Sequence, residues 1–223
     1  MNFISKKFYL NIPIIENSVN VIYIENKDIL SRFIQDIIHQ INGNVNSFII
    51  EENEKSINFT KYVECIISPF LLDVNNKRII TKLYKELNEY AVDNLIDKTV
   101  EINSMILKYL DNLTCNQVYP LEYEVDINVI DILKMYNVRI AVEETTLAEN
   151  MLNYIKFMKR ICGLKVFFLI NIKQYFKQED MLCIYKECLY EKINLILVES
   201  SYNNNYDYEK AWIIDNDLCI IEP

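Results

Sequence analysis

Short runs of β-branched and aromatic residues alternate with helical patterns along most of the chain, and this alternation leaves few folds open. Several runs are apolar at consecutive positions, which is typical of parallel strands buried on both faces. The expected strands are 19–24, 48–50, 63–67, 138–142, 165–172, 195–198 and 213–221, and the expected helices between them are 28–40, 146–162 and 178–192. The order predicts an α/β sheet that is covered by helices on both faces.

One segment breaks the alternation. From Asp73 to Tyr136 the periodicity is almost entirely helical, with helices expected at about 75–91, 93–113 and 128–136. We interpret this segment as a helical insertion. The predicted organisation is therefore a discontinuous α/β domain, residues 1–72 and 137–223, and a helical subdomain, residues 73–136.

Composition excludes several functions. The 223 residues are 51% hydrophobic, enough for a sizeable core, and 23 Lys and Arg face 32 Asp and Glu, a net charge of −9. A molecule with this charge as a whole repels nucleic acid and anionic lipid. With 2 glycines the chain contains no glycine-rich phosphate loop, and the turn from the first long strand into its helix, residues 25–28, has none. We therefore expect an ordinary capped turn there and no nucleotide binding.

The compartment is predicted from cysteines and apolar runs. The six cysteines form no C-x-x-C pair, as expected for reduced thiols of a cytoplasmic protein. The longest apolar runs, such as 166–170, are far shorter than the roughly 20 residues that cross a bilayer. The apolar stretch after Lys6 and Lys7 is interrupted by polar residues, so we expect no signal peptide and no membrane contact.

Two expected helices gather their cations on one side. Residues at i, i+3 and i+4 share a helix face, and the helix 146–162 places three cations so: Lys156, Lys159 and Arg160. The helix after Asp73 has four on one flank: Lys77, Arg78, Lys82 and Lys85. Such a stripe is often only a solvated surface. Its segregation in an acidic chain also suits the phosphates of duplex DNA, and both interpretations stay open.

Three acids alternate in the sequence LEYEVDI. In an extended segment Glu122, Glu124 and Asp126 point to the same side. Such carboxylates repel one another unless they are solvated or bridged by a hard cation, and calcium takes six to eight oxygen ligands. The pattern fits either an exposed acidic edge or a metal site. No base, nucleophile or oxyanion donor accompanies the acids, so we predict no catalytic residues.

The segment ECIISPFLLDVNNKRIITKLYKEL, residues 64–87, resembles the fourth adaptation protein of type II-A CRISPR systems, and the likeness continues through LEYEVDINVIDILKMYNVRI and KVFFLIN. The resemblance implies a P-loop-like α/β head that has lost nucleotide binding, with an inserted helical leg. It further implies a non-enzymatic homotetrameric ring that accepts double-stranded DNA ends during spacer acquisition, beside the CRISPR integrase complex and the effector nuclease.

The resemblance also implies roles for particular residues. Calcium binding near the junction of head and leg is carried over to Glu122, Glu124 and Asp126. The DNA-facing cations are carried over to Lys156, Lys159 and Arg160, and further to Lys77, Arg78, Lys82 and Lys85. Two other functions remain open: a nucleotide-dependent enzyme on a P-loop-like frame, and an acidic protein-interaction scaffold without direct DNA binding.

Overall fold

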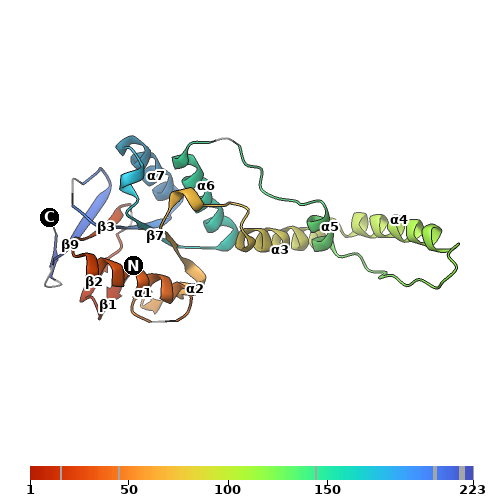
Figure 1. Ribbon diagram of the computed structural model, residues 1–223, viewed down its shortest axis with the longest axis horizontal. Helices are drawn as coiled ribbons and strands as arrows, with labels where there is room; N and C mark the ends of the chain where they lie inside the picture. The colour runs from red at the N-terminus through yellow and green to blue at the C-terminus, as the bar shows by residue number, and fades with distance from the viewer. Residues whose placement is uncertain (16, 45, 144, 203–204, 216–218, 223) are drawn as a thin grey trace. The chain divides into compact units, whose positions relative to one another are not determined.

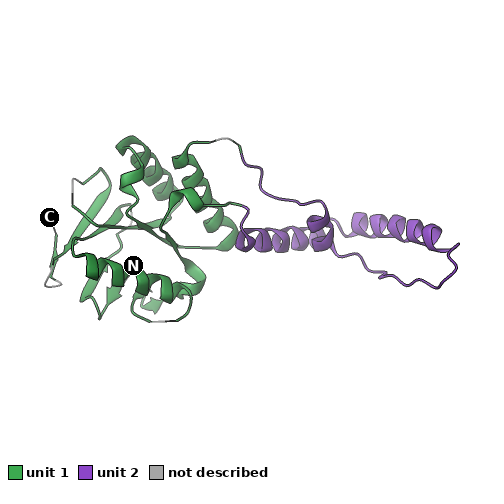
Figure 2. Cartoon of the chain, in the orientation of Figure 1, with its two compact units in different colours: residues 1–74, 143–223 green, residues 75–142 purple. Residues whose placement is uncertain are grey.

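The computed structural model describes residues 1–15, 17–44, 46–143, 145–202, 205–215 and 219–222, and divides the chain into two compact units. Unit 1 contains residues 1–74 and 143–223, and unit 2 contains residues 75–142 (Figure 2). The borders predicted from the sequence precede both observed borders by a few residues.

The core of unit 1 is a six-stranded sheet in the order β10-β9-β3-β8-β7-β6. All neighbouring pairs from β9 to β6 are parallel, and β10 is antiparallel to β9. Its strands are β3 (Val19–Ile24), β6 (Val63–Ile66), β7 (Val166–Ile170), β8 (Asn194–Glu199), β9 (Glu209–Ile214) and β10 (Ile220–Ile221). All residues of β3 and β7 are buried, as the apolar runs of these strands predict, and the one polar residue among them is Asn20 of β3.

Helices cover both faces of this sheet (Figure 1). Helix α1 (Lys27–Ile41) lies on one face, and α6 (Leu147–Cys162) and α7 (Gln178–Tyr190) lie on the other. Phe33 and Ile37 of α1 join the hydrophobic cluster that contains Ile22 and Ile24 of β3. The predicted α/β fold class is confirmed.

A second, smaller sheet in unit 1 was not predicted as such, although the strand expected at 48–50 overlaps its strand β4. It has the order β2-β1-β4-β5, with β1 (Asn2–Ser5), β2 (Leu10–Pro13), β4 (Ile49–Glu52) and β5 (Lys55–Ser56), and the short helix α2 (Phe59–Tyr62) follows it. The ring of Phe48 lies 5.3 Å from that of Phe3 and 5.0 Å from that of Phe33. This aromatic cluster joins the small sheet to α1.

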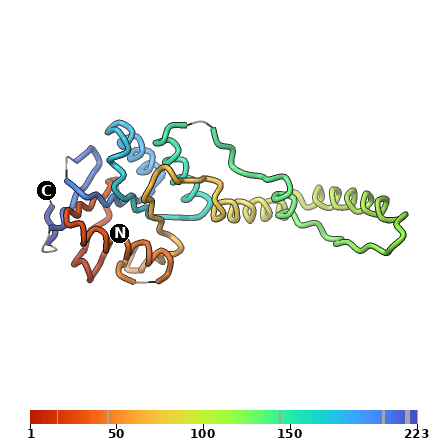
Figure 3. The backbone as a smooth tube through the Cα atoms, viewed as in Figure 1, coloured from red at the N-terminus to blue at the C-terminus, as the bar shows by residue number. Residues whose placement is uncertain are grey.

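Unit 2 is helical, with α3 (Lys77–Asn94), α4 (Ile96–Thr114) and α5 (Val129–Met135). Between α4 and α5 the chain runs back along α4 (Figure 3), where the Asn103 side chain donates a hydrogen bond to the Val125 carbonyl, 2.9 Å away. Two short 3₁₀ helices, η1 (Pro69–Leu71) and η2 (Lys173–Tyr175), belong to unit 1.

The strand expected at 138–142 is wrong, since these residues form no strand. The side chain of Asn75 makes the backbone hydrogen bonds that a neighbouring strand would make with Ile140. The Asn75 amide donates to the Ile140 carbonyl at 3.0 Å and accepts from the Ile140 N–H at 2.9 Å. One residue thus satisfies both backbone groups of Ile140 and ties the two ends of unit 2 together.

Candidate nucleic-acid interface and acidic groove

The side chain of Asn26 caps helix α1 at the turn that follows β3. The Asn26 side-chain oxygen accepts hydrogen bonds from the N–H groups of Asp28 and Ile29, at 3.0 and 3.1 Å. These are the donors that a phosphate would use at a helix N-terminus. The turn is the capped one that the sequence predicts.

Helix α6 is well defined at both ends. Thr146 and Glu149 form a capping box at its start, and Gly163 ends it with φ at 73°, in the left-handed region that glycine accepts without strain. Met151, Ile155 and Met158 are buried. The cations of α6 therefore lie on the side of the helix away from the sheet, as expected.

The three α6 cations are paired with Glu187 of the neighbouring α7 and with Glu191, the residue that caps its C-terminus. The Lys156 ammonium lies 2.6 Å from a Glu187 carboxylate oxygen, and Lys159 lies 3.6 Å from Glu191. Arg160 also pairs with Glu191 and holds the pKa of that carboxyl below its usual range. The positive charge of this stripe is thus largely balanced within unit 1.

The α3 cations are more available. Lys77, Lys82 and Lys85 are exposed, and Arg78 is half-buried. Lys85 lies 3.6 Å from Glu89 on the next turn, whereas Lys77 and Lys82 make no ion pair within 4.0 Å with any residue that the structure describes. Asn76 caps this helix by accepting from the Ile79 N–H. The α3 and α6 cations lie in different units.

The three acids of the predicted calcium site do not converge. Glu122, Glu124 and Asp126 are all exposed in the segment without regular structure between α4 and α5. Among the described residues, no three His, Cys, Asp or Glu side chains are placed to hold a metal ion. The acids as placed therefore do not provide the six to eight oxygens of a calcium shell.

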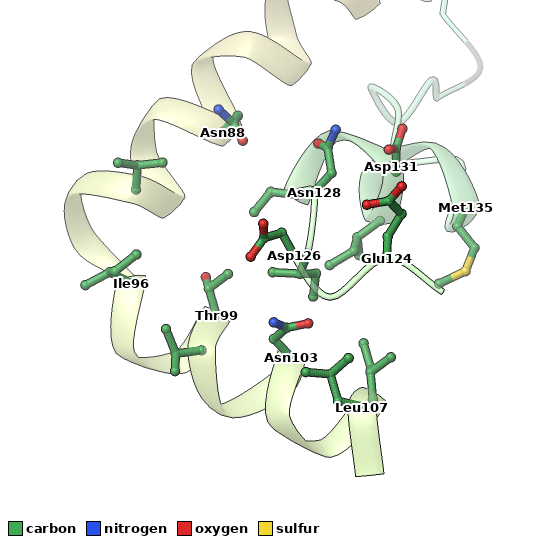
Figure 4. Close-up of a pocket in the computed structure, with 16 residues that line it drawn as sticks. Asn88, Ile96, Thr99, Asn103, Leu107, Glu124, Asp126, Asn128, Asp131 and Met135 are labelled. Atoms are coloured by element: carbon green, nitrogen blue, oxygen red, sulfur yellow. The ribbon is translucent and has the colours of Figure 1, made fainter. Parts of the chain in front are cut away.

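Two of these acids, Glu124 and Asp126, line a groove of about 950 Å³ in unit 2 (Figure 4). One wall is α4, with Ile96 and Val100, and the other is the segment that leads into α5. Glu122 is not part of the lining. The acidic segment is therefore one edge of a largely apolar groove.

Sequence reasoning missed a buried polar network in unit 1, which joins Tyr23 of β3, Lys173 of η2, Tyr185 of α7 and Glu209 of β9. The Lys173 ammonium lies 2.8 Å from both the Tyr23 hydroxyl and a Glu209 carboxylate oxygen, and the Tyr185 hydroxyl donates to Glu209 at 2.6 Å. Glu199 accepts from the N–H groups of Ile172 and Lys173. The signal in the sequence was a glutamate directly after the buried run 195–198.

Tyr202 and Tyr206 pack on this network. The ring of Tyr202 lies edge-on to that of Tyr23, with centroids 5.0 Å apart, and the Lys173 ammonium lies 4.5 Å from the centre of the Tyr206 ring. These contacts give Tyr202 and Tyr206 a packing role in unit 1.

These features define an α/β protein with a helical insertion, a capped turn in the place of a phosphate loop, and cations concentrated on two helices. The model of the CRISPR-associated protein family Cas_Csn2 matches residues 40–218. The chain belongs to this family, the Csn2 proteins of type II-A CRISPR systems, and the resemblance identified in the sequence is confirmed.

Comparison with solved structures supports the fold. The crystal structure of Stu0660 of Streptococcus thermophilus is similar over 100% of this chain and 76% of its own, with 16% identity and a TM-score of 0.59. Two ATP-binding cassettes of ABC transporters, the ADP conformation of MJ1267 and a nucleotide-free cassette, have 13% and 15% identity. The similarity covers 91% and 92% of this chain and 79% of each cassette, with TM-scores of 0.44 and 0.46.

No curated protein sequence matches the chain. Within the described residues, none of the helices has the length and apolar character needed to span a membrane.

Proposed function

We propose that this CRISPR-associated protein is a non-enzymatic, sequence-independent binder of double-stranded DNA ends, which acts as a homotetrameric ring in spacer acquisition. Membership of the Csn2 family supports a role in the CRISPR system. The proposed partners are DNA ends, further copies of the chain, the integrase complex and the effector nuclease.

The observation that carries the proposal is the exposure of Lys77 and Lys82 on α3, without ion pairs among the described residues, in a chain of net charge −9. Phosphate contact requires accessible cations and carries no sequence information. We assign the stronger DNA contacts to α3. The α6 cations contribute only where DNA phosphates compete with Glu187 and Glu191 for them.

Self-association is supported by α4. None of its 19 residues, all of them described, is buried. Ile102, Met105, Tyr109 and Leu113 follow one another at i, i+3, i+7 and i+11 and form an apolar stripe. Met105 is 60% exposed and Tyr109 is 65% exposed. These four residues, here called the α4 stripe, lie outside the groove lining and suit contact with a second copy.

Calcium binding by Glu122, Glu124 and Asp126 stays a prediction. Because the three carboxylates do not converge within the described chain, no step of the proposed function depends on the ion. Isothermal titration with calcium, compared between the wild-type protein and Asp126→Asn, tests it directly.

The decisive experiment compares linear and closed circular duplex of the same sequence and length, at several salt concentrations. A ring that threads ends retains linear DNA and loses it when the duplex is circularised, and its affinity falls steeply with salt. Equal binding of both forms contradicts a ring. If the protein binds neither the linear nor the circular form, a protein-interaction scaffold is the better interpretation.

A further inference from the structure

The groove of unit 2 has an exposed, largely apolar wall on α4 and an acidic segment on the opposite side (Figure 4). Ile96 and Val100 of α4 face Ile127 and Ile132 across it. Val100 is 57% exposed although it lines a concave surface. Apolar concavities of this extent on a protein surface mark interaction sites more often than solvent-filled hollows.

The charges that line the groove have one sign. Its ionisable lining residues are Glu124, Asp126 and Asp131, and no Lys, Arg or His is among the lining residues that the structure describes. Asp131 lies 2.9 Å from the Lys134 ammonium, but Glu124 and Asp126 make no ion pair within 4.0 Å in the described part of the chain. An occupant therefore meets apolar surface and unbalanced negative charge along the same edge.

The α4 wall has the spacing of a helix-binding groove. Ile96, Val100, Asn103 and Leu107 recur at i, i+4, i+7 and i+11. At 1.5 Å per residue they extend along roughly 16 Å, about three helical turns. A partner helix that lays its own i, i+4 and i+7 side chains along such a stripe buries them in the groove.

We propose that this groove binds a cationic amphipathic helix of another protein, with its apolar face on α4 and its Lys or Arg side chains beside Glu124 and Asp126. The α4 helix of a second copy fits less well. Helix α4 carries Asp97, Glu101 and Asp111 against Lys98 and Lys108, so seating another α4 brings carboxylates toward carboxylates. The α4 stripe that suits self-association is a different set of residues, and the groove site does not depend on DNA binding.

The probe is a fluorescent peptide of about 14 residues, roughly four turns, with leucine at helical i, i+3 and i+4 spacing and lysine elsewhere. Its counterpart replaces every lysine by glutamate. Fluorescence anisotropy measures binding to the full chain in chelator and then in calcium. The lysine peptide is expected to bind and the glutamate peptide is not.

Two pairs of variants test the acidic side of the groove and its apolar α4 wall. Glu124→Lys with Asp126→Lys is expected to weaken peptide binding at least about tenfold, whereas the matched control Asp97→Lys with Glu101→Lys, on exposed α4 positions outside the groove, leaves it nearly unchanged. Ile96→Ser with Val100→Ser is expected to weaken it similarly. Glu124→Gln with Asp126→Asn, which keeps side-chain shape, replaces the reversal if melting shows that the reversal unfolds unit 2.

Three results overturn the proposal. The first is equal loss in the groove variant and its matched control, which means unspecific attraction to an acidic protein. The second is peptide binding that appears only when Tyr109→Ser dissociates the assembly, which means that a second copy covers the groove. The third is complete release of the peptide by calcium, which assigns Glu124 and Asp126 to a metal.

Discussion

The ammonium nitrogen of Lys156 on α6 lies 2.6 Å from a carboxylate oxygen of Glu187 on α7. Together with the pairs that Lys159 and Arg160 make with Glu191, this contact joins the two helices that cover one face of the large sheet. The α6 cations thus have a structural role, whether or not they also contact DNA.

Reversal of Lys156 tests that role. We expect Lys156→Glu to lower the free energy of unfolding by about 1–2 kcal/mol, because it places a carboxylate against Glu187 and removes a partly exposed ion pair. For a chain of this size that is a fall in Tm of roughly 2–8 °C, measured by circular dichroism. Glu187→Lys in the same chain should restore part of the stability. An unchanged Tm in the single variant would show that the pair is dispensable.

The α3 cations are expected to behave differently. Lys77→Glu with Lys82→Glu should leave Tm unchanged, because both side chains are exposed and make no ion pair among the described residues. It should weaken duplex DNA binding and reduce the slope of log K against log salt by about one for each phosphate that the protein no longer neutralises. Anisotropy titrations over a salt series measure both quantities. Lys6→Glu with Lys55→Glu, at two exposed positions of unit 1, changes the net charge by the same amount and is the control, and an equal effect there would mean that only net charge matters.

The α4 stripe predicts the effect of Tyr109→Ser with Met105→Asp. Since both side chains are exposed in the single chain, the substitution should not disturb unit 2 but should remove the apolar surface for a second copy. We expect a fall in solution mass by sedimentation, and weaker retention of linear DNA in consequence. Tyr190→Ser, at an 85% exposed tyrosine of α7, is the matched control. An unchanged mass would exclude the stripe from the assembly.

Glu199 predicts how stability depends on pH. Burial raises the pKa of its carboxyl from 4.5 to about 7, partly offset by hydrogen bonds from the Lys173 and Ile172 N–H groups and by the Lys173 charge. Between pH 4.5 and 7 the folded state therefore binds more protons than the unfolded state, and stability falls as pH rises. The decrease is of order 3 kcal/mol across this window.

Glu199→Gln removes this ionisation and keeps an oxygen for the two N–H donors. Its urea-unfolding free energy relative to wild type should rise between pH 5 and pH 8. Glu179→Gln, at an exposed position of α7, should leave the wild-type pH dependence in place. If the free energies of unfolding of wild type and Glu199→Gln changed in parallel with pH, the raised pKa of Glu199 would be refuted.

Asn20 predicts a stabilising substitution. It lies on β3 at 1% exposure, and neither atom of its side-chain amide has a hydrogen-bond partner in the described chain. Asn20→Leu, of similar shape, should increase the free energy of unfolding by about 1–3 kcal/mol, because the buried amide is replaced by an apolar group. Thermal melting measures it. Asn194→Leu should give no gain, since that amide donates to the Lys165 carbonyl at 3.1 Å.

Periodicity was enough to predict most of the large sheet and its helices, but the single strand expected at 213–221 corresponds to the end of β9 and to the separate antiparallel strand β10. The strand expected at 19–24 is β3, and the helices expected at 28–40, 146–162 and 178–192 correspond to α1, α6 and α7 within a few residues. The small sheet was missed because β1 and β2 have four residues each, with alternating burial and a turn at Tyr9 with φ at 51°. Runs so short carry little signal.

The candidate sites were less predictable, because they depend on contacts between distant residues. A helical wheel placed Lys156, Lys159 and Arg160 on one face, but the acids that balance them come from α7 and its C-cap, 31 residues away in the case of Glu187. Likewise, the alternation of Glu122, Glu124 and Asp126 requires an extended segment, and the sequence does not tell what lies opposite each side chain. Only the fold reveals the groove along α4.

The bond between Asn75 and Ile140 has a consequence for how such chains diversify. The Asn75 side-chain amide joins the beginning of the helical insertion to its end. The residues between Asn75 and Ile140 therefore form an insertion whose two ends are held together. A change in the length of the segment between them can leave the register of β6 and β7 intact. The insertion can therefore be exchanged as a unit. Chimaeras joined at these two positions would combine the helical unit of one family member with the α/β unit of another.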